Sequence, residues 1–185
     1  MVRQNNIRRV ILFALRLAII APAVLVIWGL CLPAYAWFIG QCASMVLNIF
    51  GHGIERVVVD AEGLLNSKTK MGFVLGERMP TTPIALVVSN IATFVALVLA
   101  TRRLGWRDRG WAVALGVAVL AASHVTHVVV FFAFAKGIQQ HPQVPTAIAQ
   151  IFISLPFLLW IALVFLGSYG NDGTDGIHER DGKGA

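Results

Sequence analysis

Apolar residues gather in long runs that fill most of the second half of the chain. Residues 82–100, 111–135 and 144–167 contain no Asp, Glu, Lys or Arg, and a fourth run, residues 10–31, is interrupted only by Arg16. A helix rises about 1.5 Å per residue, so about 20 apolar residues cross a hydrocarbon core of about 30 Å. The pattern therefore predicts an all-α transmembrane bundle of about four helices.

Between the first and second runs, residues 51–80 return to a mixed pattern with two strand-like segments. Residues 56–59 read Arg-Val-Val-Val, and residues 70–75 end at Gly76. β-Branched and apolar residues bounded by turn formers are typical of strands. They predict a small extracytoplasmic β-hairpin or meander. If the two strands pair in simple register, one face of the hairpin carries Val57, Val59, Phe73 and Leu75, and we expect this face to pack against the bundle.

The preceding residues, 32–50, are apolar but include Gln41, Ser44 and Asn48. They either extend the first helix outward or lie in the outer interface as an amphipathic helix. We divide the chain into an N-terminal anchor with this segment (1–50), the outer hairpin segment (51–80) and a three-span bundle (81–167). The remaining residues, 168–185, are rich in Gly and Asp and predict a disordered cytoplasmic tail.

Composition and charge indicate a membrane protein. Hydrophobic residues make up 57 % of the chain and charged residues 13 %, too little charge to cover a soluble domain of this size. Most arginines form two clusters, Arg3, Arg8, Arg9 and Arg16, and Arg102, Arg103, Arg107 and Arg109. Such clusters beside apolar spans are cytoplasmic by the positive-inside rule, which places both termini inside. The implied partner is the lipid bilayer, and nucleic acid is not expected.

Polar side chains inside the apolar runs are the first places to look for function, because they are expensive in hydrocarbon. Arg16 lies near the cytoplasmic end of its run, where it can snorkel to the interface. Ser89 and Asn90 lie in the second run. His124 and His127 are three residues apart in the third run and therefore share one helix face.

Three polar residues fall in the outer half of the predicted bundle. They are the candidate catalytic residues: Ser89, His127 and His141. A histidine can act as a general base, and a hydroxyl paired with it can act as a nucleophile. The structural alternative is that the serine bonds its own backbone, Asn90 bridges helices and His141 is a solvated loop residue. A haem or metal would need ligands from a second helix, and residues 82–100 and 144–167 contain no histidine, so no cofactor or metal is expected.

The order of these features resembles the second half of the exosortase/archaeosortase family of membrane transpeptidases. That order is an outer hairpin, an inward span, an arginine-rich inner turn, a span with outer polar residues, and an outer histidine before the last span. Members of the family process C-terminal sorting signals at the outer face of the membrane with a Cys–Arg–His set. The resemblance covers residues 56–167 and implies a multi-pass protein of the bacterial inner membrane.

Residue by residue, the resemblance is partial. The family's cysteine position falls in residues 83–90, where Ser89 is the nearest nucleophilic side chain, and its arginine position falls in residues 123–130, where His127 stands. His141 matches the histidine, whereas Cys31 and Cys42 lie on another element. A thiolate beside a cation is a strong nucleophile, and arginine holds a developing oxyanion, so their absence weighs against an enzyme.

We therefore expect a non-catalytic integral membrane accessory or scaffold protein of the exosortase sorting system, similar to the small membrane proteins associated with exosortase H. The partner this implies is an exosortase or another membrane protein. One alternative is a divergent exosortase-like transpeptidase or protease that uses Ser89, His127 and His141. The other is a small subunit of a membrane transport or redox complex, in which His124 and His127 handle protons or a cofactor.

Overall fold

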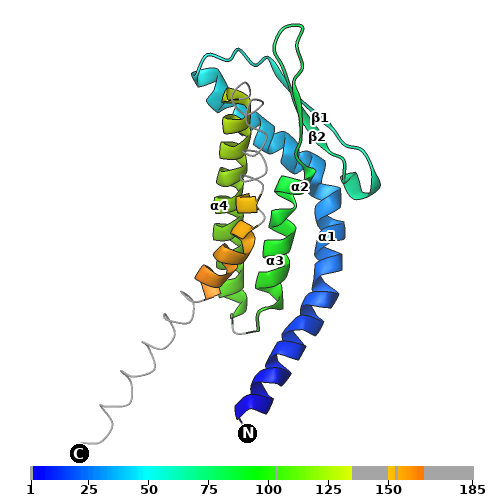
Figure 1. Cartoon of the computed structure of the whole chain (residues 1–185), viewed down its shortest axis with the longest axis vertical. Coiled ribbons are helices and arrows are strands. Elements are labelled where there is room, and N and C mark those ends of the chain that lie inside the picture. The colour runs from blue at the N-terminus through cyan, green and yellow to red at the C-terminus, as the bar shows by residue number, and fades with distance from the viewer. Residues whose placement is uncertain (1, 103, 135–149, 153, 165–185) are drawn as a thin grey trace, which may run out of the picture.

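The computed structural model describes residues 2–102, 104–134, 150–152 and 154–164, and it is mostly helical with one small antiparallel sheet. The predicted tail, residues 168–185, lies outside the described residues. Four helices lie side by side in the described part of the chain: α1 (Val2–Ile49), α3 (Asn90–Ala100), α4 (Trp106–Ala133) and a last helix, Gln150–Val164 (Figure 1). The sheet lies toward one end of these helices, which we call the sheet end. The turn between α3 and α4, of which residues 101, 102, 104 and 105 are described, lies at the other end, the turn end.

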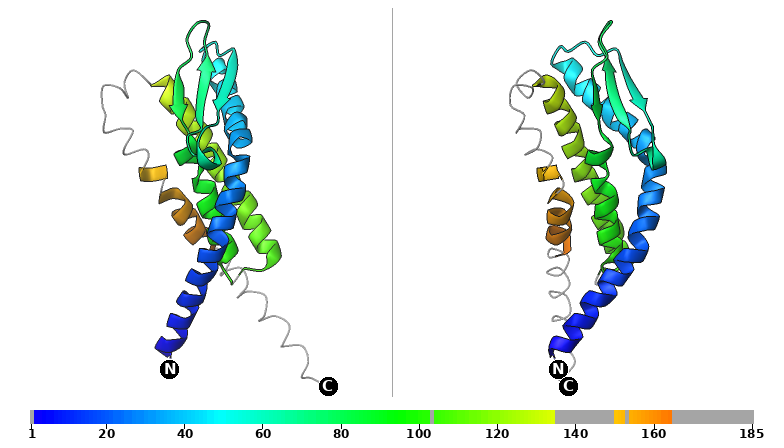
Figure 2. Two further views of the ribbon diagram at one scale, coloured as in Figure 1. Left: turned by 90° about the vertical axis from the view of Figure 1, so that its right-hand side faces the viewer. Right: turned by 45° about the vertical axis from the view of Figure 1, so that its right-hand side comes forward.

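Helix α1 continues without a break through residues 32–49, for which the sequence allowed either an extension of the first helix or a separate interfacial helix. It runs for 48 residues to Ile49, about 70 Å at 1.5 Å per residue, so residues 32–49 extend the first helix. Pro22 and Pro33 lie inside it. A proline removes a helical N–H and crowds the carbonyl four residues earlier, which bends a helix. The axis of α1 changes direction in its light-blue part, and the helix then passes beneath the sheet (Figures 1 and 2).

The connection from α1 to the sheet is short and closely held. Gly51 and Gly53 have φ values of 81° and 64°, in the left-handed region that glycine adopts without a Cβ penalty. The Asn48 side chain donates from Nδ2 to the Ile54 carbonyl at 3.0 Å and accepts the Ile54 N–H at 2.6 Å. These two bonds fix the start of the first strand relative to the end of α1.

The sheet consists of β1 (Arg56–Asp60), β2 (Lys70–Val74) and β3 (Thr81–Pro83) in the order β1-β2-β3. Val57 pairs with Phe73, and Val59 pairs with Met71. Val57, Phe73 and Met71 are buried, and Val59 and Leu75 pack against the same core. The prediction that one face of the hairpin would rest on the helices is confirmed.

The third strand lies where the sequence analysis placed the beginning of an apolar span. Thr82 pairs with Met71, and the helical conformation begins only at Ala85 in the short helix α2 (Ala85–Val88). A residue before proline is biased toward extended backbone, which favours a strand at Thr82. The predicted span of residues 82–100 is therefore shorter, and it is divided at Ser89 into α2 and α3.

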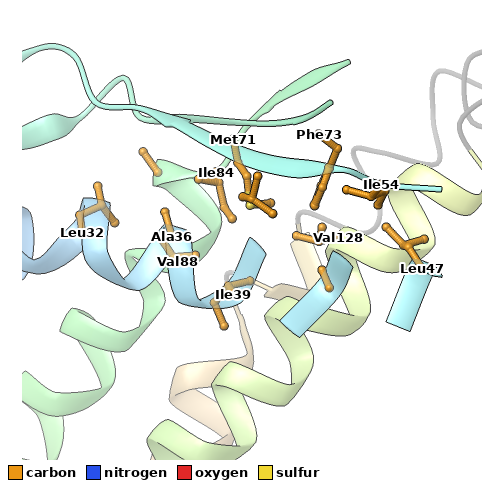
Figure 3. Close-up of a cluster of buried hydrophobic side chains, with 13 residues drawn as sticks. Leu32, Ala36, Ile39, Leu47, Ile54, Met71, Phe73, Ile84, Val88 and Val128 are labelled. Atoms are coloured by element: carbon orange, nitrogen blue, oxygen red, sulfur yellow. The ribbon is translucent and has the colours of Figure 1, made fainter. Parts of the chain in front are cut away.

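The main core lies between the sheet and α1. One face of α1 carries a row of buried residues that we call the α1 stripe: Leu32, Ala36, Ile39, Ala43 and Leu47. Their spacing of three or four residues places them on one side of a helix. Figure 3 shows Leu32, Ala36, Ile39 and Leu47 of the stripe on the helix beneath Met71 and Phe73 of the sheet, with Val128 of α4 in the same cluster. The Phe73 ring also meets Phe132 edge-on, with centroids 4.5 Å apart.

Two glycines mark the closest approaches in the fold. A Cβ at Gly40 would lie 2.5 Å from Val57 Cγ1 and 2.7 Å from Met71 Sδ, so the sheet rests directly on the backbone of α1. A Cβ at Gly116 would overlap the ring of Phe94, which lets α3 pack tightly on α4. A second buried cluster forms around this contact with Ile91, Val98 and Leu120.

Two of the helices are long and apolar enough to cross a membrane: residues 10–49 of α1, and α4. Helix α3 and the last helix are apolar but shorter, with 11 residues in α3. Every residue in the most apolar 18-residue stretch of α1 is at least partly exposed. The coarse prediction of a helical protein with a small β element is therefore correct, and the four-span arrangement stays a prediction.

The contact of Phe94 with Gly116 predicts a sharp difference between two glycines of α4. Gly116→Leu should destabilise the protein by about 1–3 kcal/mol or more, because the added side chain needs the space that the Phe94 ring fills. Gly110→Leu is the matched control, since a Cβ there has no neighbour within 4 Å. Thermal unfolding of the detergent-solubilised protein, followed by circular dichroism, measures both; equal melting temperatures would contradict the close packing.

Candidate functional site

Ser89 lies at the break between α2 and α3. Its hydroxyl donates to the Ala85 carbonyl at 2.6 Å, one turn earlier on the same segment. Its own carbonyl accepts the N–H groups of Ala92 and Thr93, at 3.1 and 3.4 Å. Such bonding to the preceding turn is common for serine in apolar helices and often accompanies a bend. The Ser89 oxygen is therefore held by backbone in this conformation.

Asn90, the next residue, connects two helices. It is buried, and its Nδ2 donates to the Phe152 carbonyl in the last helix. An unsatisfied amide in an apolar environment is costly, so a bond to a neighbouring helix is the expected solution. The prediction that Asn90 bridges helices is confirmed.

The centre of the polar site is a pair formed by the half-buried Tyr35 of α1 and His124 of α4. The Tyr35 hydroxyl and His124 Nδ1 share a hydrogen bond of 2.9 Å, and the two rings meet edge-on with centroids 6.0 Å apart. His124 is fully buried. The Trp28 ring also packs on Tyr35, with ring centroids 5.0 Å apart. The pair therefore ties α1 to α4 between the two hydrophobic clusters.

The second ring nitrogen of His124 faces a largely apolar surrounding. Its Nε2 is buried and has no hydrogen-bond partner among the residues that the structure describes. The Phe152 ring lies nearly parallel to the imidazole, with centroids 6.2 Å apart. This enclosure suits a structural link better than proton exchange with solvent.

His127 lies one turn after His124, as their spacing predicts, but its neighbours are aromatic. Its ring meets Phe152 at a centroid distance of 4.8 Å and an angle of 67°, and Phe131 lies 6.4 Å away. Within the described part of the chain, no hydrogen bond joins Ser89 to His127. His141 falls in residues 135–149, outside the described residues, so the third member of the predicted set stays a prediction.

The described residues contain no group of three or more His, Cys, Asp or Glu side chains that could hold a metal ion. His124 and His127 both flank Phe152, an apolar ring that offers no ligand. Cys31 and Cys42 are free and lie on α1. In the part of the chain that the structure describes, Ser89 and His127 do not form a nucleophile–base pair, and the hydrogen bonds of Tyr35, His124 and Asn90 connect helices.

The sequence patterns did not predict Tyr35 as the partner of His124. The residue could have been found, because a tyrosine hydroxyl buried within an apolar run usually bonds a polar group. Histidines are among the few strong partners within the apolar runs. What the sequence does not contain is the relative rotation of α1 and α4, which brings together two residues 89 positions apart.

A second polar group lies at the turn end. Thr101 ends α3, and its hydroxyl donates to the Leu97 carbonyl at 2.8 Å and accepts Trp160 Nε1 at 2.9 Å. Arg109 of α4 donates to the Thr101 carbonyl at 2.8 Å, and its guanidinium lies 5.0 Å from the Trp106 ring centroid. The contacts of Thr101 therefore join α3, α4 and the last helix.

Comparison with known proteins adds no relative: no family model, no curated protein and no solved structure matches the chain.

The Tyr35–His124 bond predicts a measurable coupling between α1 and α4. Tyr35→Phe should lower the free energy of unfolding by about 1 kcal/mol, because it leaves His124 Nδ1 buried without its partner. The double variant Tyr35→Phe/His124→Phe should cost less than the sum of the two single variants. Thr126→Val is the control, since this exposed hydroxyl bonds only the Ala122 carbonyl of its own helix. Unfolding in detergent gives all four values; strict additivity would show that the pair does not couple the helices.

Proposed function

We propose that the chain is a multi-pass protein of the bacterial inner membrane, with its termini in the cytoplasm and its sheet on the outer face. Two levels of the structure support a membrane between them. Arg16 and Arg102 line one cleft at the turn end, and Ala36 of the α1 stripe lies under the sheet. The 20 residue steps from Arg16 to Ala36 rise about 30 Å, close to the thickness of a hydrocarbon core.

The surface between these levels supports the same proposal. Ile19, Ile27 and Leu30 of α1 are 68 %, 63 % and 69 % exposed, which would be unfavourable in water as part of one continuous apolar surface. Trp106 and Trp111, at the turn end of α4, are also exposed. Tryptophan is enriched at membrane interfaces, and the arginines beside this turn favour a cytoplasmic location.

Within that membrane, we propose a non-catalytic accessory or scaffold role related to the exosortase sorting system. The observation that carries this proposal is how the polar groups of the apolar helices are used. Tyr35 and His124 join α1 to α4, Asn90 joins α3 to the last helix, and Ser89 bonds its own backbone. The cysteine and arginine of the resembling family have no counterpart at the matching positions. These features favour a protein that acts as a rigid scaffold for a partner.

The sheet end offers a surface for such a partner. Exposed apolar side chains project there from the end of α1 and from the β2–β3 loop, with exposed fractions of 82 % for Ile49, 72 % for Phe50 and 54 % for Met79. Apolar groups of this kind, rimmed by polar loops, are typical of protein or membrane contacts. An exosortase or another membrane protein with an outer domain is the partner that this surface fits.

The proposed orientation predicts opposite accessibility of two exposed positions. In a Cys31→Ala/Cys42→Ala background, Glu77→Cys near the end of the β2–β3 hairpin should react with a membrane-impermeant maleimide on intact cells. Arg107→Cys at the turn end should react only after permeabilisation, because the positive-inside rule places it in the cytoplasm. Labelling of Arg107→Cys alone on intact cells would mean that the orientation is inverted.

The scaffold role predicts which substitutions matter for sorting. In cells that express an exosortase, processing of a tagged sorting-signal substrate should change less than about twofold with Ser89→Ala or His127→Ala, because a scaffold does not use them as a catalytic unit. Gly40→Leu should impair processing, because it lifts the sheet from α1. Protein abundance is checked by immunoblot.

The same experiment separates the scaffold from the divergent enzyme. Loss of processing by several orders of magnitude with Ser89→Ala, at normal abundance, would overturn the accessory proposal in favour of catalysis. Unchanged processing when the whole protein is removed would exclude both roles for that substrate.

A further inference from the structure

A cleft of about 750 Å³ lies at the turn end, far from the Tyr35–His124 pair. It is formed by the beginning of α1, the end of α3 with the adjoining turn, and the last helix. Its described lining consists of Val10, Leu12, Phe13, Arg16, Ala100, Thr101, Arg102 and Trp160. This volume is within the range of small-ligand sites.

Among the described lining residues of the cleft, the two charged groups are both cations. Arg16 comes from α1 and Arg102 from the α3–α4 turn, and none of the described lining residues carries a carboxylate. The neutral polar groups are already bonded to each other, because Trp160 Nε1 donates to the Thr101 hydroxyl. Two arginines on one cleft whose described lining carries no carboxylate form a site for an anion, since guanidinium groups bind phosphate in a bidentate manner.

Arg109 shows why Arg102 remains free for a ligand. The carbonyl of Thr101, at the end of α3, accepts its hydrogen bond from Arg109, whose guanidinium also lies over Trp106. The end of α3 therefore does not need Arg102 as a cap. Arg102 and Arg16 are both exposed, and within the described residues neither forms an ion pair with an acidic side chain.

The remainder of the cleft is apolar and continues onto the exposed side of α1. Phe13 stacks on Trp160 with centroids 5.8 Å apart, and Val10 and Leu12 extend the apolar wall. A soluble anion would leave this wall exposed. A ligand with a phosphate at one end and acyl chains at the other would cover both parts, and basic pockets between membrane helices on the cytoplasmic side are known to hold acidic lipid headgroups.

We infer that this cleft binds the phosphodiester headgroup of an acidic phospholipid from the cytoplasmic leaflet, with Arg16 and Arg102 on the phosphate and an acyl chain along Val10, Leu12 and Phe13. The inference rests on the proposed membrane location. It assigns to Arg16 a ligand that also relieves the cost of placing an arginine near the hydrocarbon core.

The test uses the full chain purified in detergent micelles that contain equal amounts of phosphatidylglycerol and phosphatidylcholine. Native mass spectrometry should show phosphatidylglycerol retained at least about tenfold over phosphatidylcholine. Arg16→Gln/Arg102→Gln should lose most of this preference. Arg8→Gln/Arg107→Gln, which removes the same charge from exposed positions outside the cleft, should keep it.

Three outcomes would overturn the inference. Equal retention of both lipids by the wild type would exclude the site even if the double variant does not fold. Equal loss in both double variants would mean that net charge attracts the lipid. Displacement of the lipid by glycerol 3-phosphate at similar concentration would assign the cleft to a soluble anion. Alkaline carbonate extraction of cell membranes separates these results from failure of the membrane proposal, because a peripheral protein would be released.

Discussion

The α1 stripe is covered by the sheet on one side and by α2 and α4 on another, and this shared contact positions the sheet, α2 and α4 relative to α1. A sheet of three short strands is marginal in water, so it needs an apolar surface beneath it. Gly40 lets Val57 and Met71 approach the helix backbone directly. The sheet in turn covers Val128 and Phe132 of α4 through Phe73. Loosening this contact would release the sheet and also the part of α4 near the sheet end.

Hydrogen bonds then determine the rotation of each helix about its own axis. Apolar packing alone tolerates rotation, but a buried polar group in an apolar surrounding accepts few orientations. The Tyr35–His124 bond orients α1 against α4, and Asn90 orients α3 against the last helix. Thr101 does the same at the turn end, where it meets Trp160 and Arg109. In membranes such bonds contribute about 0.6 kcal/mol on average, so they specify the arrangement more than they stabilise it.

Much of the fold follows from sequence patterns, and the exceptions have identifiable causes. The apolar runs predicted the long helices, and strand alternation predicted the buried face with Val57 and Phe73. Strand β3 was missed because Thr82 begins a run without charged residues and was therefore read as part of a span. Its pairing with Met71 depends on the free edge of β2, which no local pattern contains. At the candidate site, His124 and Asn90 were recognised as polar residues within spans. Their partners, Tyr35 and the Phe152 carbonyl, depend on helix rotations that no local pattern contains.

The sequence separation of these contacts has a consequence for the order in which the chain assembles. The α1 stripe and the strands that cover it are near neighbours along the chain, so the contact closes at a low cost in loop entropy. The Tyr35–His124 bond, by contrast, closes a separation of 89 residues and needs α4 in place. As the chain emerges from the ribosome, α1 and the sheet can therefore form a folded unit first. The helices that follow then dock onto a surface that is already shaped to receive them.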